Sequence, residues 1–200
     1  VAAMEEEKLA RQPHAGGLPE RAIAACLETI SASPEHLDCI AIARPIAERG
    51  DSSLHLHLRF LFPKARIVMV DHHTAHAASA FYPSPFEEAR VLTLDRVGDM
   101  RCGALWEADA SRLDPIEEIY APDSPAAFYS RVSELLGFRS GAEEHKVQWL
   151  SVTGQPAYHD VFLDILAADG RQRPQLDHDY FDMSRPARGG FSERFYSALG

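Results

Sequence analysis

The sequence has few cysteines, no long apolar run and a shortage of positive charge. Its three cysteines, Cys26, Cys39 and Cys102, are widely spaced and odd in number, which favours buried thiols in a reducing compartment over a disulfide framework. No apolar stretch approaches the roughly 20 residues of a membrane span. Residues 1–7 are acidic, whereas a signal peptide would be basic and then apolar. We therefore expect a cytoplasmic protein that does not enter a membrane.

The deficit of Lys and Arg bears on the partners of the protein. There are 20 Lys and Arg against 30 Asp and Glu, and the net charge is -10. Binding to nucleic-acid phosphates is driven by clustered basic side chains. We therefore expect no nucleic-acid partner. The 46% hydrophobic and 25% charged content is otherwise typical of a globular chain.

Helical and strand-like patterns alternate along the chain. Apolar residues at helical spacing predict helices, and short β-branched runs predict buried strands. We expect strands at 39–43, 66–70 and 91–94, and an antiparallel pair at 102–107 and 116–120. We expect helices at 20–30, from residue 52 or 53 to 61, from residue 72 onward and at 126–136, with a loop at 169–190. This alternation predicts an α/β fold, a mixed sheet flanked by helices.

The most informative segment is the histidine cluster at His72, His73 and His76. It follows the strand expected at 66–70 and precedes an alanine-rich stretch of high helix propensity. On a helix His72 and His76 are one turn apart and share a face, where two neutral imidazoles can hold one transition-metal ion. His73 points elsewhere and is a weaker candidate. Solvated histidines at a helix start are the alternative interpretation.

Two further groups of residues are candidates for binding phosphate. Asp95, Gly98 and Asp99 follow the strand expected at 91–94, as in a loop that meets phosphate through a metal ion or backbone N–H groups. Lys146 can pair with a phosphate as a point charge. The alternatives are an ordinary turn and a solvated surface lysine.

Several motifs occur in order along nearly the whole chain. They are Glu5–Arg11, the segment His72-His73-x-x-His76 running on to Phe81, Ser84–Phe86, Leu92–Asp95 with Gly98-Asp99, Ser124 with Phe128–Ser130, Leu136–Phe138, and Glu144-x-Lys146-Val147. In this order and at these spacings they resemble the O-carbamoyltransferases. That family includes nodulation protein U and the enzymes that carbamoylate cephamycins and aminoglycosides.

The resemblance implies a fold and a chemistry. The fold is an actin-like, ribonuclease H-like ATPase domain, of which residues 1–200 would be a partial N-terminal domain without the adenylate-forming C-terminal domain. The chemistry is carbamoyl transfer from carbamoyl phosphate, with ATP and through a carbamoyl-adenylate, to a hydroxyl of a small natural product or sugar. Fe²⁺ or a similar divalent ion is the implied metal.

The resemblance also implies roles for individual residues. His72 and His76 become catalytic metal ligands. Asp95 and Gly98 become part of the nucleotide-phosphate loop, with Asp99 beside it. Lys146 becomes a phosphate or structural contact.

The sequence departs from the family pattern at several positions. Arg96 replaces a loop glycine, and Trp149 stands where a glycine would leave room. Two histidines are fewer than the three protein ligands of a usual catalytic metal, so weak metal binding is expected.

Two alternatives stay open. One is a non-catalytic remnant that binds metal or nucleotide weakly. The other is a tRNA threonylcarbamoyladenosine synthase-like enzyme, against which the acidic charge and the Ser79-Ala80-Phe81 continuation argue.

Overall fold

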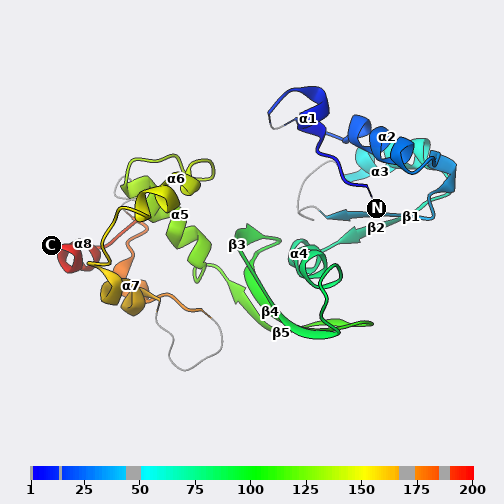
Figure 1. The fold of residues 1–200 in the computed structure, drawn as a ribbon. Helices are drawn as coiled ribbons and strands as arrows, with labels where there is room; N and C mark the ends of the chain where they lie inside the picture. Colours follow the sequence, from blue (N-terminus) through cyan, green and yellow to red (C-terminus); the bar gives the residue numbers. More distant parts are fainter. Residues whose placement is uncertain (1, 14, 44–50, 167–173, 185–189) are drawn as a thin grey trace. The chain divides into compact units, whose positions relative to one another are not determined.

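The computed structural model describes residues 2–13, 15–43, 51–166, 174–184 and 190–200. These residues divide into two compact units, Val1–Asp71 and His72–Gly200 (Figure 1). Both units combine helices with strands, which confirms the predicted α/β class. None of the described helices is long and apolar enough to cross a membrane.

The first unit is a pair of parallel strands with helices. Its elements are α1 (Glu6–Ala10), α2 (Glu20–Thr29), η1 (Pro34–His36), β1 (Cys39–Ala43), α3 (Asp51–Leu61) and β2 (Arg66–Val70). β1 and β2 pair in parallel, and α3 lies between them in the chain, as the connection of parallel strands requires. Leu58, Phe62 and Ala65 are buried and pack against Ile40 and Ile42. The helices and strands predicted in this region are confirmed.

The second unit contains a three-stranded antiparallel sheet in the order β3-β4-β5. Its elements are α4 (His72–Phe81), β3 (Glu88–Gly98), β4 (Arg101–Asp109), β5 (Leu113–Tyr120), α5 (Pro125–Leu135), α6 (Glu144–Ser151), α7 (His159–Ile165), η2 (His178–Tyr180) and α8 (Glu193–Leu199). α4 lies over the sheet, where Ala77 packs with Ala104 and Trp106. The antiparallel pair that the sequence predicts is confirmed, and so is the histidine helix.

The end of β3 differs from the prediction. The sequence predicts a loop after Leu94, but the strand continues to Gly98, which pairs with Arg101. The turn between them consists of Asp99 and Met100, with φ angles of 53° and 75°. Two central residues with positive φ are typical of a tight type I′ hairpin. The register shifts between Leu94 and Gly98, so the strand carries a bulge, a feature that redirects side chains.

The strands also pair differently from the prediction of one mixed sheet. The described strands form two sheets, one parallel and one antiparallel. Local patterns predict strands well, but they do not contain the long-range pairing that decides which strands share a sheet.

The segment predicted as a loop at 169–190 contributes some of its described residues to a core. Residues 167–173 and 185–189 lie outside the described residues. Leu176 and Tyr180 are buried with Phe128 and Ile165. Phe191 and Phe195 complete this cluster, and their rings stack at 3.9 Å between centroids. Aromatic burial rather than regular secondary structure orders this part of the chain.

Candidate metal centre

His72, His76 and Asp95 lie together where the start of α4 meets the bulged end of β3. His72 Nε2 is 2.8 Å from Asp95 Oδ2 and 3.2 Å from His76 Nε2. His76 Nε2 is 3.8 Å from the same carboxylate oxygen. Within the parts of the chain that the structure describes, these are the side chains of the His, Cys, Asp and Glu type placed to share a metal ion.

The geometry and the chemistry of the three side chains fit a divalent ion. Donor atoms bonded to one ion at about 2.1 Å lie about 3.0–3.4 Å apart in octahedral or tetrahedral arrangements. The three distances here bracket that range. Two imidazoles and one carboxylate form the ligand set of non-haem Fe²⁺ sites, and Zn²⁺ accepts the same ligands.

Asp95 changes the interpretation of the site. The sequence predicts two protein ligands and assigns Asp95 to a nucleotide loop. In the structure Asp95 is a third candidate ligand beside the two histidines. No local spacing signals this, because the contact depends on a bulged strand reaching the helix from 23 residues away in the chain. The ligand set therefore reaches the three side chains typical of a catalytic metal.

The surroundings of Asp95 favour its charged form. Partial burial acts to raise the pKa of Asp95, but the hydrogen bond with His72 and the backbone N–H of Arg96 outweigh it. The charges of His72 and His76 add to this effect, and the pKa falls below its ordinary value. The carboxylate is therefore ionised at neutral pH, as metal ligation requires.

Gly98 and Asp99 both contact His72. The backbone N–H of His72 donates to Asp99 Oδ2 at 2.9 Å. Gly98 lies against the His72 ring so closely that a Cβ at this position would be 2.1 Å from the ring carbon Cδ2. Their predicted contact with nucleotide stays a prediction, but the structure gives both a direct relation to the metal ligand.

His73 is separate from the metal site. Its side chain is fully buried, with Nδ1 3.1 Å from Thr93 Oγ1 and Nε2 3.2 Å from the carbonyl oxygen of Arg101. A carbonyl can only accept, so Nε2 carries the proton. Its ring lies edge-on to the His72 ring, 5.2 Å away between centroids, but its nitrogens bond to other groups, and it is not part of the candidate ligand cluster.

An open hollow of about 870 Å³ adjoins the cluster. It is lined by Asp95, Arg96, Val97, Ala126, Tyr129, Ser130, Ser140, Gly141 and Glu144. Since Asp95 belongs both to this wall and to the metal cluster, a molecule in the hollow lies beside the candidate metal centre. Serine hydroxyls, a tyrosine, a guanidinium and two carboxylates lie in this wall beside apolar surface.

Glu144 is the most strongly held carboxylate of the hollow. Its Oε1 accepts from the backbone N–H of Gly141 at 2.5 Å and from the Ser130 hydroxyl at 2.8 Å. The Gly141 hydrogen bond, followed by those from its own backbone N–H and from Ser130, lowers the pKa of Glu144 to about 2. The sequence did not single out Glu144 as a site residue, because a glutamate in the first turn of a helix has many ordinary uses.

Lys146 and Trp149 do not line the hollow. The ammonium of Lys146 pairs with Glu143 at 2.6 Å. Trp149, which the sequence led us to expect would crowd the site, is 73% exposed on α6. The predicted crowding is therefore wrong, and a phosphate contact of Lys146 stays a prediction.

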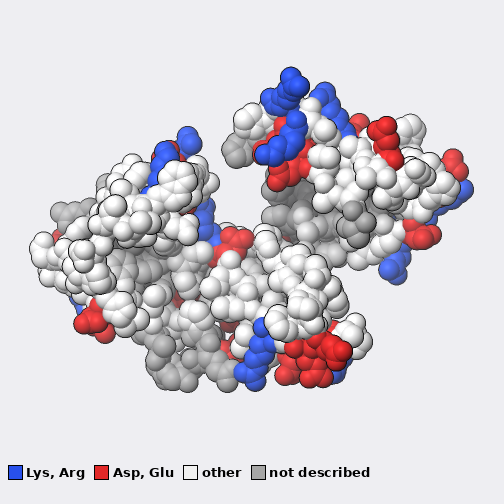
Figure 2. Space-filling view, viewed as in Figure 1, with Lys and Arg blue, Asp and Glu red and all other residues white. Residues whose placement is uncertain are grey.

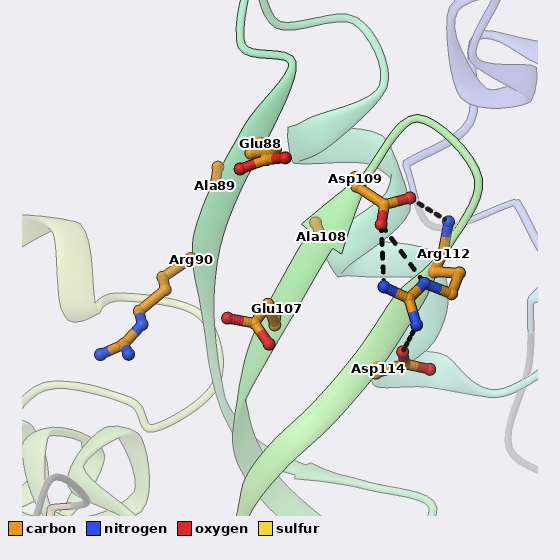
Figure 3. A pocket seen from close by; sticks show the side chains of 8 residues that line it. All are labelled: Glu88, Ala89, Arg90, Glu107, Ala108, Asp109, Arg112 and Asp114. Atoms are coloured by element: carbon orange, nitrogen blue, oxygen red, sulfur yellow. Dashed lines mark hydrogen bonds and ion pairs between the residues drawn. The ribbon is translucent and has the colours of Figure 1, made fainter.

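A second hollow at the other end of the sheet is lined by four carboxylates and two arginines. Acidic side chains gather at this end of the sheet (Figure 2). Asp109 accepts from Arg112, which also approaches Asp114 (Figure 3). Hydrogen bonds from the backbone and side chain of Ser111 lower the pKa of Asp109 to about 2. We assign no binding role to this cluster, because the Arg112 guanidinium that could meet a ligand is already paired with Asp109 and Asp114.

Comparison with known proteins agrees with the motifs. The family model described as carbamoyltransferase N-terminus matches residues 47–185. An uncharacterized Synechocystis protein is 32% identical over 222 residues, covering 91% of this chain and 36% of that protein. Nodulation protein NolNO of Sinorhizobium fredii is 32% identical, covering 88% of this chain and 30% of the relative. Nodulation protein NolO of Bradyrhizobium diazoefficiens is 30% identical over 54% of this chain.

The chain therefore belongs to the carbamoyltransferase family and corresponds to its N-terminal part. It spans about a third of the length of the first two relatives. The family resemblance of the sequence motifs is confirmed.

Proposed function

We propose that this protein transfers a carbamoyl group from carbamoyl phosphate to a hydroxyl of a small natural product or sugar. ATP activates the group as a carbamoyl-adenylate, and Fe²⁺ or a similar divalent ion is held by His72, His76 and Asp95. Membership of the carbamoyltransferase family supports carbamoyl transfer in general. The observation that carries the finer proposal is the His72–His76–Asp95 cluster beside an open hollow whose wall contains hydroxyl, guanidinium and carboxylate groups.

The three ligands would give the metal a defined role. When bound, a divalent ion of this kind acts as a Lewis acid that polarises a carbonyl or phosphoryl oxygen. His72 and His76 offer neutral nitrogen donors, and the ionised Asp95 supplies the single negative charge of the set. Because only one ligand is charged, the site keeps net positive charge for an anionic donor substrate.

The hollow would hold the reactants next to that site. Transfer forms a bond between the acceptor oxygen and the carbamoyl carbon, breaks the bond between that carbon and the phosphate oxygen of AMP, and releases the hydroxyl proton to solvent. The hydroxyls of Tyr129, Ser130 and Ser140 and the Glu144 carboxylate can hydrogen-bond a polar acceptor. Arg96 lines the same wall, and a guanidinium is suited to phosphate oxygens. Fixing both partners in one hollow supplies the orientation that such a transfer needs.

The test is product formation by the purified protein. The protein is combined with an adenylate-forming C-terminal domain of the family and incubated with Fe²⁺, ATP, carbamoyl phosphate and a panel of aminoglycoside, cephem and sugar acceptors, and carbamoylated product is detected by mass spectrometry. We expect His76→Ala to reduce the rate on the order of 10²-fold or more, because it removes a ligand. His159→Ala is the matched control, since this exposed histidine of α7 lies outside the cluster.

Two results would overturn the proposal. An unchanged rate in His76→Ala would exclude the cluster from the chemistry. Metal binding by the wild type without transfer to any acceptor would favour the non-catalytic alternative.

A further inference from the structure

We propose that Gly98 and Asp99, at the tip of the β3–β4 hairpin, are positioning residues that hold His72 in its metal-binding arrangement. Gly98 leaves the space that the imidazole ring fills, and Asp99 anchors the backbone of the same residue. This proposal rests on the proposed metal centre. It gives the two residues a role different from the nucleotide contact that the sequence motif suggests.

The absence of a side chain at Gly98 is required by the His72 ring. A Cβ there would lie 2.1 Å from His72 Cδ2, 2.7 Å from Cγ and 2.8 Å from Nε2. All three distances are far below van der Waals contact, so the ring and a methyl group cannot both occupy this place.

The backbone itself does not require glycine at this position. The φ angle of Gly98 is outside the left-handed region that favours glycine. It also lies in a strand, where alanine is allowed. The requirement for glycine therefore comes from the neighbouring ring alone.

A displaced His72 ring would lose its place in the metal site. The side chain is 24% exposed, so the ring can move toward solvent. That movement would break the 2.8 Å contact with Asp95 and the 3.2 Å contact with His76. Gly98→Ala should therefore reduce metal affinity strongly while leaving the fold intact.

Asp99 determines where α4 begins. His72 is the first residue of α4, and the first N–H groups of a helix have no partner inside the helix. Asp99 Oδ2 accepts the His72 N–H at 2.9 Å from the hairpin turn. The bond ties the start of α4 to the end of β3, which carries Asp95. It thereby sets the position of His72, and of His76 one turn later, relative to the carboxylate.

The first experiment compares two glycine variants of the whole chain. Co²⁺ affinity is measured by titration calorimetry, and the ligand-field spectrum reports the donor set. We expect Gly98→Ala to weaken binding about 10–100-fold, the usual effect of losing a group that orients a ligand. Gly154→Ala is the control, because its Cβ would meet nothing closer than 3.4 Å. Wild-type affinity in Gly98→Ala would overturn the proposal.

A double-variant cycle separates the ring clash from a backbone effect. If Gly98 acts by making room for the ring, Gly98→Ala should reproduce the affinity and spectrum of His72→Ala. The double variant should then bind no more weakly than His72→Ala alone. Additive losses would show that Gly98 acts through something other than His72, and would overturn the proposal.

Asp99 is tested by a conservative pair. Asp99→Asn keeps an acceptor oxygen and should retain metal affinity within about threefold, whereas Asp99→Ala should lose about tenfold. Equal losses in the two variants would overturn the anchoring role. Loss of ATP binding with metal binding intact, in either the Gly98 or the Asp99 variants, would favour the nucleotide role instead.

The outcomes distinguish this inference from the proposed function. If the variants behave as expected and no carbamoylated product forms, the proposed function fails and the positioning roles stand. If the wild type transfers carbamoyl groups and the variants bind Co²⁺ normally, the positioning roles fail alone. A wild type that binds no Co²⁺ overturns both.

Discussion

At the scale of single residues, the site depends on side chains whose surroundings fix their charge and direction. Asp95 is kept ionised by the hydrogen bonds and charges around it. Glu144 is held still more firmly by a backbone N–H and a serine hydroxyl. Such perturbed carboxylates often gather at functional sites, and here both line the same hollow.

The ligand role of Asp95 can be tested directly. Asp95→Ala removes the one charged donor, so we expect Fe²⁺ or Co²⁺ affinity to fall on the order of 10²-fold or more by titration calorimetry. Asp160→Ala is the control, because the Asp160 side chain is fully exposed on α7. An Asp95→Ala variant that binds the metal as tightly as the wild type would show that Asp95 is not a ligand and that His72 and His76 alone hold the metal.

The low pKa of Glu144 predicts a dependence of stability on pH. In the folded state its pKa is about 2, against an ordinary 4.5. The charged form therefore stabilises the fold fully above about pH 4.5, and this contribution is lost as the pH falls toward 2. Thermal unfolding followed by circular dichroism measures the melting temperature. From about pH 5.5 to 7 the carboxyl group is ionised in both the folded and the unfolded state, so the melting temperature of the wild type should exceed that of Glu144→Gln by a constant margin. That margin should shrink at lower pH.

The exposed Glu134 of α5 provides the control for this titration. Its carboxylate does not line the hollow, so Glu134→Gln makes the same chemical change as Glu144→Gln at a position outside it. A margin for Glu144→Gln that stays constant down to about pH 3 would contradict the assignment, because the linkage requires the loss to begin as the unfolded-state carboxyl group becomes protonated.

At the scale of elements, polar contacts join α4, β3, β4 and α5 around the site. Thr93 Oγ1 accepts from the backbone N–H of Ala104 and from the indole N–H of Trp106, and it lies 3.1 Å from His73 Nδ1. Ser124, the N-cap of α5, accepts from the N–H of Ala127 and donates to the carbonyl oxygen of Asp95. One hydroxyl thus locks the histidine helix to the sheet, and another ties α5 to the candidate ligand.

The Thr93 hydroxyl should matter more than its size suggests. Thr93→Val keeps the shape of the side chain but leaves Trp106 Nε1 and the N–H of Ala104 without this acceptor. Unsatisfied buried donors are costly, so we expect the free energy of unfolding to fall by about 2–3 kcal/mol in urea titrations. Thr93→Ser retains the hydroxyl, so its free energy of unfolding should fall by less than half of the decrease in Thr93→Val. A loss in Thr93→Ser as large as that in Thr93→Val would contradict this expectation, because it would mean that the methyl group contributes as much as the hydrogen bonds.

At the scale of the whole molecule, the candidate metal centre belongs to one unit. His72, His76, Asp95, Gly98 and Asp99 all fall within His72–Gly200. The first unit has its own buried cluster around Leu58, Phe62 and Ala65. Separate cores allow the two units to respond separately to substitution.

A core substitution in the first unit tests this separation. Leu58 is 2% exposed, and Leu58→Ala should lower the free energy of unfolding of that unit by about 2–5 kcal/mol. Co²⁺ affinity, measured where the protein is still folded, should stay within about twofold of the wild type, because no ligand or positioning residue belongs to that unit. A parallel loss of metal affinity would show that the centre depends on both units.

Most of the elements, and the family, can be predicted from local patterns in the sequence. Helical spacing and β-branched runs are local signals, so the histidine helix, the two strands of the first unit and the antiparallel pair were all predictable. The i, i+4 spacing identified His72 and His76 without any tertiary information. The ordered motifs identified the carbamoyltransferase family, which the comparisons confirm.

Only the tertiary structure decided what completes the site. Asp95 joins the histidines because β3 continues beyond its predicted end and carries a bulge. Gly98 and Asp99 meet His72 because a two-residue turn places the hairpin tip at the start of α4. These contacts link residues more than 20 positions apart. They follow from strand register and packing, which are properties of paired segments and are not encoded in the local pattern of either one.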